Sequence, residues 1–277
     1  MKKYYKWRRT RKVNFRPHVL KRKNIPLLRA IATSKMEGSM ESFAFIDSKP
    51  PKFSTIWNDE ENFDQLFRAV CEGDLQYVQE IKMSSSEINR ALNLACKKGH
   101  SHIVKYLLKR NGNVYFKDDV SNLDAISTAT YFNHGEVIKI LLSSRKIPKL
   151  PKVEFQNNCV PLLHFASICG CVSSVKALVN NEFVKVNLNE GDQDHWRPLH
   201  YSVSQRNHEI SRFLLENGAD PNAEGLYKMC PLHIAAYKED IEMVHLLLDF
   251  GANPKKFVSV NTPRYSFSFE DVYLERK

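Results

Sequence analysis

The chain has 277 residues, a hydrophobic content of 43% and a formal net charge of +10. No apolar run approaches the roughly 18–20 residues that cross a bilayer, and no apolar segment of about 7–15 residues follows the basic start. The sequence therefore predicts neither a membrane span nor a signal peptide. The six cysteines form no CxxC pair, which is typical of an intracellular chain without disulfides or a zinc site. We expect a protein of the cytoplasm, the nucleus or both.

The positive charge lies at the N-terminus. Residues 1–35 hold 13 Lys and Arg and no Asp or Glu, so the remaining chain carries a net charge of −3. Two basic clusters stand among the aromatic residues of positions 1–24: Arg8, Arg9, Arg11 and Lys12, then Lys21, Arg22 and Lys23. This basic arm could bind an import receptor as a nuclear signal, or nucleic acid through its cations and aromatic rings. An acidic surface, a mitochondrial presequence and a solvated tail without a partner are the alternatives.

A linker is expected after the arm. Residues 31–56 contain Ser-, Pro- and Gly-bearing stretches such as Ser48-Lys49-Pro50-Pro51. We therefore divide the chain into residues 1–59, a basic and largely disordered arm with its linker, and residues 60–277, a folded domain.

Beyond residue 60 the chain repeats itself. The weaker upstream copies are Leu66–Val70, Gly99–Leu108, His134–Leu142 and Leu162–Ala166. Two copies then align without gaps. The first contains Arg197-Pro198-Leu199-His200, Phe213-Leu214-Leu215 and Gly218-Ala219-Asp220-Pro221. The second contains Cys230-Pro231-Leu232-His233, Leu246-Leu247-Leu248 and Gly251-Ala252-Asn253-Pro254. Pro198 and Pro231 are 33 residues apart, a period that indicates a stacked-repeat architecture.

The equivalent positions vary along the array. Phe67, Asn93, Ser127, His164, His200 and His233 follow one another at intervals of 26, 34, 37, 36 and 33 residues. The first interval is short at Ser84–Ser86, and the third contains the insertion Lys146–Pro151, whose two prolines favour an extended loop. An atypical seventh copy begins at Thr262-Pro263.

This pattern resembles the ankyrin repeat, whose family consensus reads TPLHLAA, GH, VVKLLL and GADVN in that order. The resemblance implies an all-α solenoid of stacked helix-turn-helix units with β-hairpin-like loops, about six repeats and a partial seventh over residues 60–277. Proline suits the first turn of each first helix. Gly218 and Gly251 supply left-handed helix ends. The motif histidine bonds locally and ties adjacent repeats together, and each unit needs its neighbours to bury its apolar face.

The resemblance also implies where a partner binds, on a concave groove formed by the first helices and the hairpin tips. The candidate contacts on the helices are Lys97, Lys98, Tyr131, Phe132, Ile168, Ser204, Gln205, Tyr237 and Lys238. The candidates on the tips are Gln193, Asp194, Trp196, Leu226, Tyr227 and Met229. Aromatic residues and Met are enriched at interface centres, so we predict an apolar, aromatic centre flanked by lysines that suits a peptide with hydrophobic anchors and acidic residues. The alternative is that Tyr131 and Phe132 pack between degenerate repeats.

The sequence contains no catalytic motif that persuades us. It has no Gly-rich phosphate loop, GxSxG or HExxH, and three of its histidines occupy the repeat's structural position. We expect no enzymatic activity, no cofactor and no metal. The leading hypothesis is a monomeric protein-interaction module that acts as an intracellular adaptor, scaffold or inhibitor. The alternatives are a nucleic-acid-associated or nuclear factor that uses the basic arm, and a truncated substrate receptor.

Overall fold

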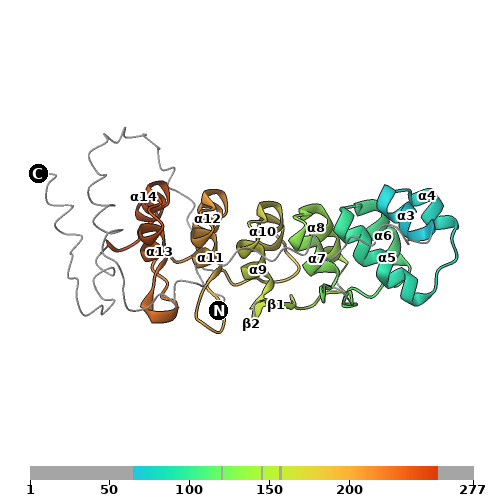
Figure 1. Ribbon diagram of the computed structural model, residues 1–277, viewed down its shortest axis with the longest axis horizontal. Helices are drawn as coiled ribbons and strands as arrows, with labels where there is room; N and C mark the ends of the chain where they lie inside the picture. Colours follow the sequence, from blue (N-terminus) through green and yellow to red (C-terminus); the bar gives the residue numbers. More distant parts are fainter. Residues whose placement is uncertain (1–64, 120, 145, 156–157, 255–277) are drawn as a thin grey trace, which may run out of the picture.

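A computed structural model describes residues 65–254 except for positions 120, 145 and 156–157. The basic arm of residues 1–24, the linker and the atypical seventh copy lie outside the described residues. The described part contains twelve α-helices in six consecutive pairs, and each pair is one repeat (Figure 1). The pairs are α3 (Gln65–Glu72) with α4 (Leu75–Glu80), α5 (Ser85–Lys98) with α6 (Ser101–Lys109), α7 (Ala125–Tyr131) with α8 (Gly135–Ser143), α9 (Leu162–Ile168) with α10 (Val172–Val179), α11 (Pro198–Ser204) with α12 (His208–Glu216), and α13 (Pro231–Tyr237) with α14 (Ile241–Asp249).

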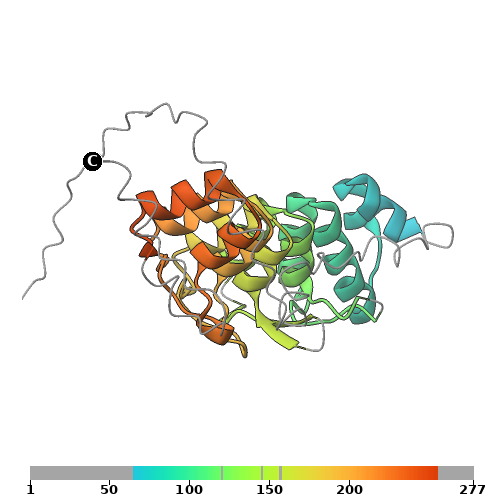
Figure 2. The same ribbon diagram turned by 60° about the vertical axis from the view of Figure 1, so that its left-hand side comes forward.

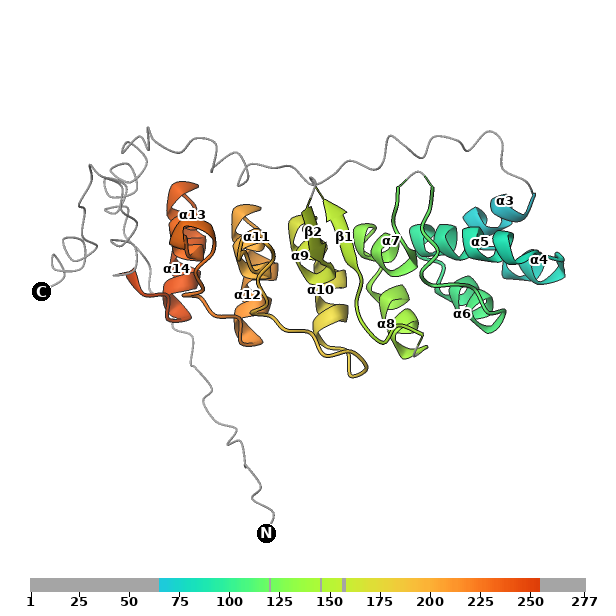
Figure 3. The same ribbon diagram turned by 90° about the horizontal axis from the view of Figure 1, so that it is seen from below.

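The helices form two rows. The first helices α3, α5, α7, α9, α11 and α13 each contact the next in order, and the second helices α4, α6, α8, α10, α12 and α14 do the same. Figure 3 shows the two rows side by side, and Figure 2 shows the pairs stacked one behind another. The predicted all-α ankyrin-like solenoid is confirmed.

Loops join the end of each second helix to the next first helix, as predicted. The loop before α9 holds the described strands, β1 (Lys152–Phe155) and β2 (Asn158–Pro161), which pair antiparallel with Val153 opposite Val160. Strand β1 follows the Lys146–Pro151 insertion, which is not helical, as expected from its two prolines. The loop before α13 contains the short 3-10 helix η4 (Leu226–Lys228).

The core runs along the whole array between the two rows. The leucine and β-branched positions of the second helices are buried in every repeat, for example Leu107, Ile138, Val175, Leu214 and Leu247. Each second helix contacts the first helix of its own repeat and the second helix of the neighbouring repeat. Burial of apolar side chains is the dominant favourable contribution to folding. Here it depends on stacking, because one helix pair alone would leave its apolar side chains exposed to water.

The helix ends follow the sequence signals. The shortened first connection ends in a capping box, in which the Ser84 hydroxyl accepts the Glu87 amide and the Glu87 carboxylate accepts the Ser84 amide. Gly218 follows the cap residue of α12 with a φ of 95°, and Gly251 follows the cap residue of α14 with a φ of 88°. Both are the left-handed helix ends that were predicted.

Candidate functional site

The predicted helix contacts share one structural position. In the third to sixth repeats each pair consists of the last residue of the first helix and the residue that caps it, and in the second repeat Lys97 and Lys98 end α5. We call this set, together with Cys169, which caps α9, the helix-end strip; its predicted members are Lys97, Lys98, Tyr131, Phe132, Ile168, Ser204, Gln205, Tyr237 and Lys238. Because consecutive first helices are in contact, the strip runs continuously along one edge of the first-helix row.

The strip has an aromatic centre. The rings of Tyr131 and Phe132 meet edge to face with their centroids 5.0 Å apart, and Tyr131 also stacks on Phe165 of the next repeat at 6.2 Å. The ammonium of Lys97, from the preceding repeat, lies 5.9 Å from the centre of the Phe132 ring. Tyr131 and Phe132 are half-buried, so they pack between repeats and also present part of their rings to solvent. The packing alternative is therefore seen for both rings, while their role in partner binding stays a prediction.

The backbone of the strip is held by the following repeat. The His134 ring donates from Nε2 to the Lys97 carbonyl at 2.9 Å, and His100 makes the equivalent bond to the Cys71 carbonyl at 2.9 Å. In the fourth repeat a thiol takes this place, because Cys171 Sγ lies 3.3 Å from the Tyr131 carbonyl. These hydrogen bonds hold the ends of three first helices, α3, α5 and α7, in place.

The motif histidines tie the repeats in the opposite direction along the chain. His164 donates from Nε2 to the Trp196 carbonyl at 3.0 Å, and His200 donates to the Met229 carbonyl at 3.1 Å. Asn93 performs the same task in the second repeat, where its amide donates to the Leu123 carbonyl at 3.0 Å. The predicted linking role of the motif position is thus seen in these residues.

Burial determines the protonation state of these rings. Burial is the main cause that lowers the pKa of His200 to about 4, and it also lowers the pKa of His164. At neutral pH both rings are neutral, with a proton on Nε2 for the carbonyl of the next repeat. The Arg197 amide donates to His200 Nδ1 at 3.2 Å, which agrees with this arrangement.

Several predicted contacts are buried, which corrects the sequence interpretation. Trp196 and Met229 were expected to add accessible apolar surface, but the Trp196 side chain is only 3% exposed and Met229 is buried as well. Ile168, at 1% exposed, and Ser204 also face the interior. These four buried side chains are therefore part of the packed interior rather than of the accessible surface.

The burial of Trp196 has a clear structural cause. Its ring centroid lies 5.3 Å from that of Tyr201 and 5.5 Å from that of His200, both on α11. On its other side a β-carbon at Gly225 would lie 3.1 Å from the indole Cδ1 atom, so the ring packs directly against the glycine backbone of the next loop. The indole therefore fills the space between a first helix and the following hairpin.

The hairpin tips form a more polar surface than predicted. Gln193 is exposed and Asp194 is half-buried, while Leu226 retains an exposed apolar side chain at 38%. The side chain of Tyr227 lies outside the described residues. Sequence reasoning did not identify Asp192, whose carboxylate accepts the Trp196 amide at 2.9 Å and the Tyr201 hydroxyl. The signal in the sequence that could have identified Asp192 is an acidic residue four positions before the tryptophan of a hairpin loop.

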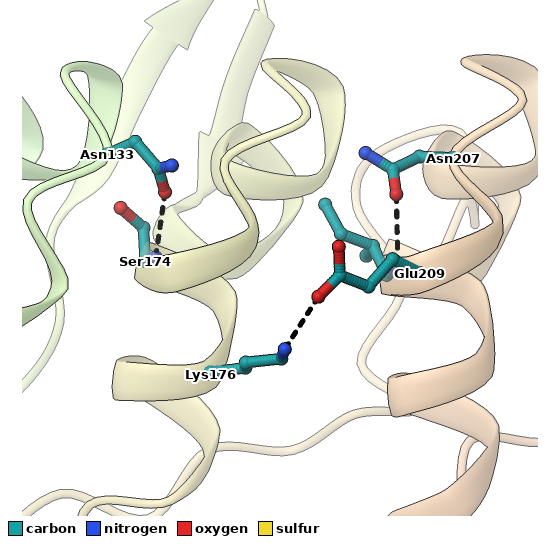
Figure 4. A network of polar contacts seen from close by, with 6 residues as sticks. Asn133, Ser174, Lys176, Asn207 and Glu209 are labelled. Carbon is teal, nitrogen blue, oxygen red and sulfur yellow. Dashed lines mark hydrogen bonds and ion pairs between the residues drawn. The ribbon is translucent and has the colours of Figure 1, made fainter.

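The second helices carry their own polar ties. The Asn133 side chain accepts the Ser174 amide at 3.1 Å, and Lys176 forms an ion pair with Glu209 at 2.7 Å (Figure 4). Asn207 caps α12 through the Ile210 amide at 2.9 Å. Such exposed pairs contribute little stability individually.

Residues 65–254, with the gaps given above, contain no group of three or more His, Cys, Asp or Glu side chains placed to hold a metal ion. Within the same residues, no helix has both the length and the apolar character that a bilayer crossing requires. All six cysteines lie in the described part, and none forms a disulfide.

Comparisons with known proteins agree with this geometry. A model of three ankyrin repeats matches residues 66–152 and 149–225, and a second ankyrin-repeat model matches residues 207–248. The chain therefore belongs to the ankyrin-repeat family. Repeats of this family are generally non-catalytic protein–protein interaction modules.

The relatives show how widely this architecture is used. Alpha-latrocrustotoxin-Lt1a of Latrodectus tredecimguttatus is 28% identical over 63% of this chain and 12% of its own length. The Saccharomyces cerevisiae protein named "probable 26S proteasome regulatory subunit p28" is 26% identical over 59% of this chain and 71% of its own. An ankyrin repeat protein of Acanthamoeba polyphaga mimivirus is 26% identical over 65% of this chain and 23% of its own. The chain thus covers a small part of the first and third relatives.

Proposed function

We propose that the chain binds a protein partner through the helix-end strip and acts as a non-catalytic adaptor, scaffold or inhibitor inside the cell. The observation that carries this proposal is the aromatic centre, in which Lys97, Phe132, Tyr131 and Phe165 follow one another across three repeats. Aromatic residues are enriched at the centres of protein interfaces, and Tyr is among the residue types that dominate binding energy there.

The chemistry of the strip favours one class of partner segment. Half-buried rings at the centre suit an apolar anchor, and Lys97, Lys98 and Lys238 suit acidic residues on either side of it. At the sixth repeat, Tyr237 adds a further apolar surface that is 37% exposed. The partner is therefore a peptide segment with a hydrophobic anchor flanked by Asp or Glu.

The ties beneath the strip support binding because they reduce its entropic cost. The carbonyls of Lys97 and Tyr131 are held by His134 and Cys171, and the Lys238 carbonyl accepts a bond from Arg206. A surface that is already fixed loses less conformational freedom when a partner docks.

The test is quantitative capture of proteins from cell lysate with the full chain and matched variants. Phe132→Ala removes the central ring, and Lys97→Glu combined with Lys238→Glu reverses the flanking charge. The controls are Phe183→Ala, which removes a 50% exposed ring outside the strip, and Lys109→Glu, which reverses an exposed charge on α6.

We expect one set of partners to bind the wild type and both controls, and to lose on the order of 30-fold in affinity with Phe132→Ala, as for a hot spot of about 2 kcal/mol. Circular dichroism confirms that each variant is folded. Equal capture of the same partners by folded strip variants and wild type would show that the strip is not the binding surface.

A further inference from the structure

A short acidic stretch of sequence lies directly before the first repeat. Residues 56–64, which we call the acidic segment, read Ile56-Trp57-Asn58-Asp59-Glu60-Glu61-Asn62-Phe63-Asp64. The segment holds four carboxylates and no Lys or Arg, and its apolar residues stand near its two ends. It therefore combines hydrophobic anchors with acidic residues, which is the chemistry proposed above for a peptide bound to the helix-end strip.

The first-helix row is basic at the end that is nearest to this segment. Helices α3, α5 and α7 together hold four Lys and Arg against two Glu. The exposed Arg90 guanidinium lies 5.1 Å from the centre of the Phe67 ring, at the junction of the first two repeats, and Lys97 and Lys98 end α5. By contrast, residues 182–254 hold 12 Asp and Glu and 6 Lys and Arg, a net charge of −6. The acidic segment is therefore attracted to the first repeats and repelled by the last ones.

The length of the acidic segment matches the distance to the strip. Helices α3, α5 and α7 follow one another in the first-helix row (Figure 3), and the eight residues of α3 rise about 12 Å from Gln65 to the level of the strip. Neighbouring helices pack about 8–10 Å apart, so Lys97 lies about 15 Å and Phe132 about 22 Å from Gln65. An extended chain covers about 3.3 Å per residue, which takes Glu60 about 16 Å and Trp57 about 26 Å from Gln65. The carboxylates therefore reach Lys97, and the indole reaches the aromatic centre.

The aromatic centre of the strip has a geometry that suits an indole. The Tyr131 and Phe132 rings meet edge to face and are half-buried, and the Lys97 ammonium lies beside the Phe132 ring. A further aromatic ring can add edge-to-face or offset contacts here, and an indole is the ring that binds a cation best. We propose that the acidic segment binds the helix-end strip of its own chain, with Trp57 on the aromatic centre and carboxylates beside Lys97, and competes there with a protein partner. The competition rests on the proposed function, whereas the docking of the segment does not.

A weak interaction is sufficient for this competition, because the segment and the strip belong to one chain. A short connection gives a tethered segment an effective concentration of about 1 mM. If the segment bound as a free peptide with a Kd of about 0.1 mM, the tethered segment would occupy the strip in about ten chains for each open one, and it would weaken the apparent affinity of a partner about tenfold. Only a partner that binds more tightly than this threshold displaces the segment.

The direct test places the photoreactive residue p-benzoylphenylalanine at position 57 of the full chain. After irradiation, trypsin digestion and mass spectrometry identify the peptides that are cross-linked to this position. We expect the main product to contain the peptide Asp118–Lys139, which carries Tyr131 and Phe132. The matched control carries the same photoreactive residue in place of Trp7 in the basic arm, and it should not enrich this peptide.

Variants of the strip make the cross-link specific to its aromatic centre. If Phe132→Ala weakens the docking about 30-fold, as expected for a partner, the occupied fraction falls from about 90% to about 25% and the yield of the cross-link falls about fourfold. Lys109→Glu reverses an exposed charge on α6, in the second-helix row, and should leave the yield unchanged. Circular dichroism confirms that each variant is folded.

A charge swap tests the ionic part of the docking. Glu60→Lys combined with Glu61→Lys places like charges beside the end of α5 and should lower the yield of the cross-link. Lys97→Glu combined with Lys98→Glu in that same chain restores opposite charges and should restore the yield. Such a rescue shows that the two groups of side chains meet, which the loss alone does not show.

Three outcomes would overturn the docking of the segment. The first is a yield of the Asp118–Lys139 product from position 57 that is no higher than from position 7. The second is a yield that the reversal of Glu60 and Glu61 leaves unchanged. The third is a cross-link that joins isotopically labelled to unlabelled chains in a mixture of the two, which would make a second copy the occupant of the strip.

Partner capture separates this proposal from the proposed function. Trp57→Ala in the full chain should strengthen the capture of partners about tenfold, because it opens the strip. Unchanged capture by this variant, in a protein that forms the cross-link from position 57, would refute the competition. If Phe132→Ala abolishes capture but position 57 forms no cross-link with the strip, the docking of the segment is refuted and the proposed function stands.

Discussion

Replacing Trp196 with alanine removes the indole that fills the space between α11 and the next loop. The side chain is 3% exposed and lies against Tyr201 on one side and the Gly225 backbone on the other. An aromatic side chain buries roughly 150–250 Å², which at about 25 cal/mol per Å² corresponds to about 4–6 kcal/mol as an upper bound. Since alanine retains part of that area, we expect the free energy of unfolding to fall by about 3–5 kcal/mol.

Urea unfolding of the full chain, followed by far-UV circular dichroism, measures this loss. The whole curve is compared, because repeat arrays can lose two-state cooperativity. The matched control is Phe183→Ala, whose ring is 50% exposed and whose loss should change stability by no more than about 0.5 kcal/mol. A Trp196→Ala curve that superimposes on the wild type, or a control that costs as much, would refute the role assigned to the indole.

Two further changes probe the contacts between repeats. Burial lowers the pKa of His200 from 6.5 to about 4, so between these values the unfolded chain binds one proton more, and the free energy of unfolding falls by on the order of 3 kcal/mol as the pH drops through this window. His200→Asn, which copies the hydrogen bond made by Asn93, should remove the contribution of His200 to this pH dependence and leave that of His164. If the free energy of unfolding, measured by urea titration, depended on pH as steeply in the variant as in the wild type, the assignment to His200 would be wrong. Gly135→Ala places a β-carbon 2.6 Å from the Ser173 carbonyl oxygen and should lower the free energy of unfolding by about 1–3 kcal/mol. Equal thermal midpoints for this variant and the wild type would contradict the prediction and show that α10 moves aside.

The register of the array could be predicted from the sequence because it rests on positions with a strong local requirement. Pro198 and Pro231 begin first helices, and Gly218 and Gly251 end second helices, as their backbone preferences demand. Asn93 was placed at the motif position by spacing alone, and it makes the same inter-repeat bond as the histidines. Local propensity and period were sufficient for these features.

The accessible surface was harder to predict because it depends on two repeats at once. Trp196 is buried since the following loop offers a glycine at position 225, and spacing gives no information about that contact. Cys171 likewise replaces the histidine of other repeats in a tie that no motif describes. By contrast, Tyr131 and Phe132 were correctly located at one helix end, because the repeat register fixes that position. Their role in binding stays a prediction.

The hydrogen bonds from Asn93, His164 and His200 to the loop of the next repeat have a consequence for how the array can change in length. His164 reaches the Trp196 carbonyl and His200 reaches the Met229 carbonyl, two acceptors that are 33 residues apart. If residues 197–229 were excised, Trp196 would stand directly before Cys230-Pro231, and His164 would keep its own acceptor. Removal of this 33-residue unit would thus leave the buried His164 donor with an equivalent acceptor, so a whole repeat can be lost or duplicated in a gene without breaking the hydrogen bonds between its neighbours.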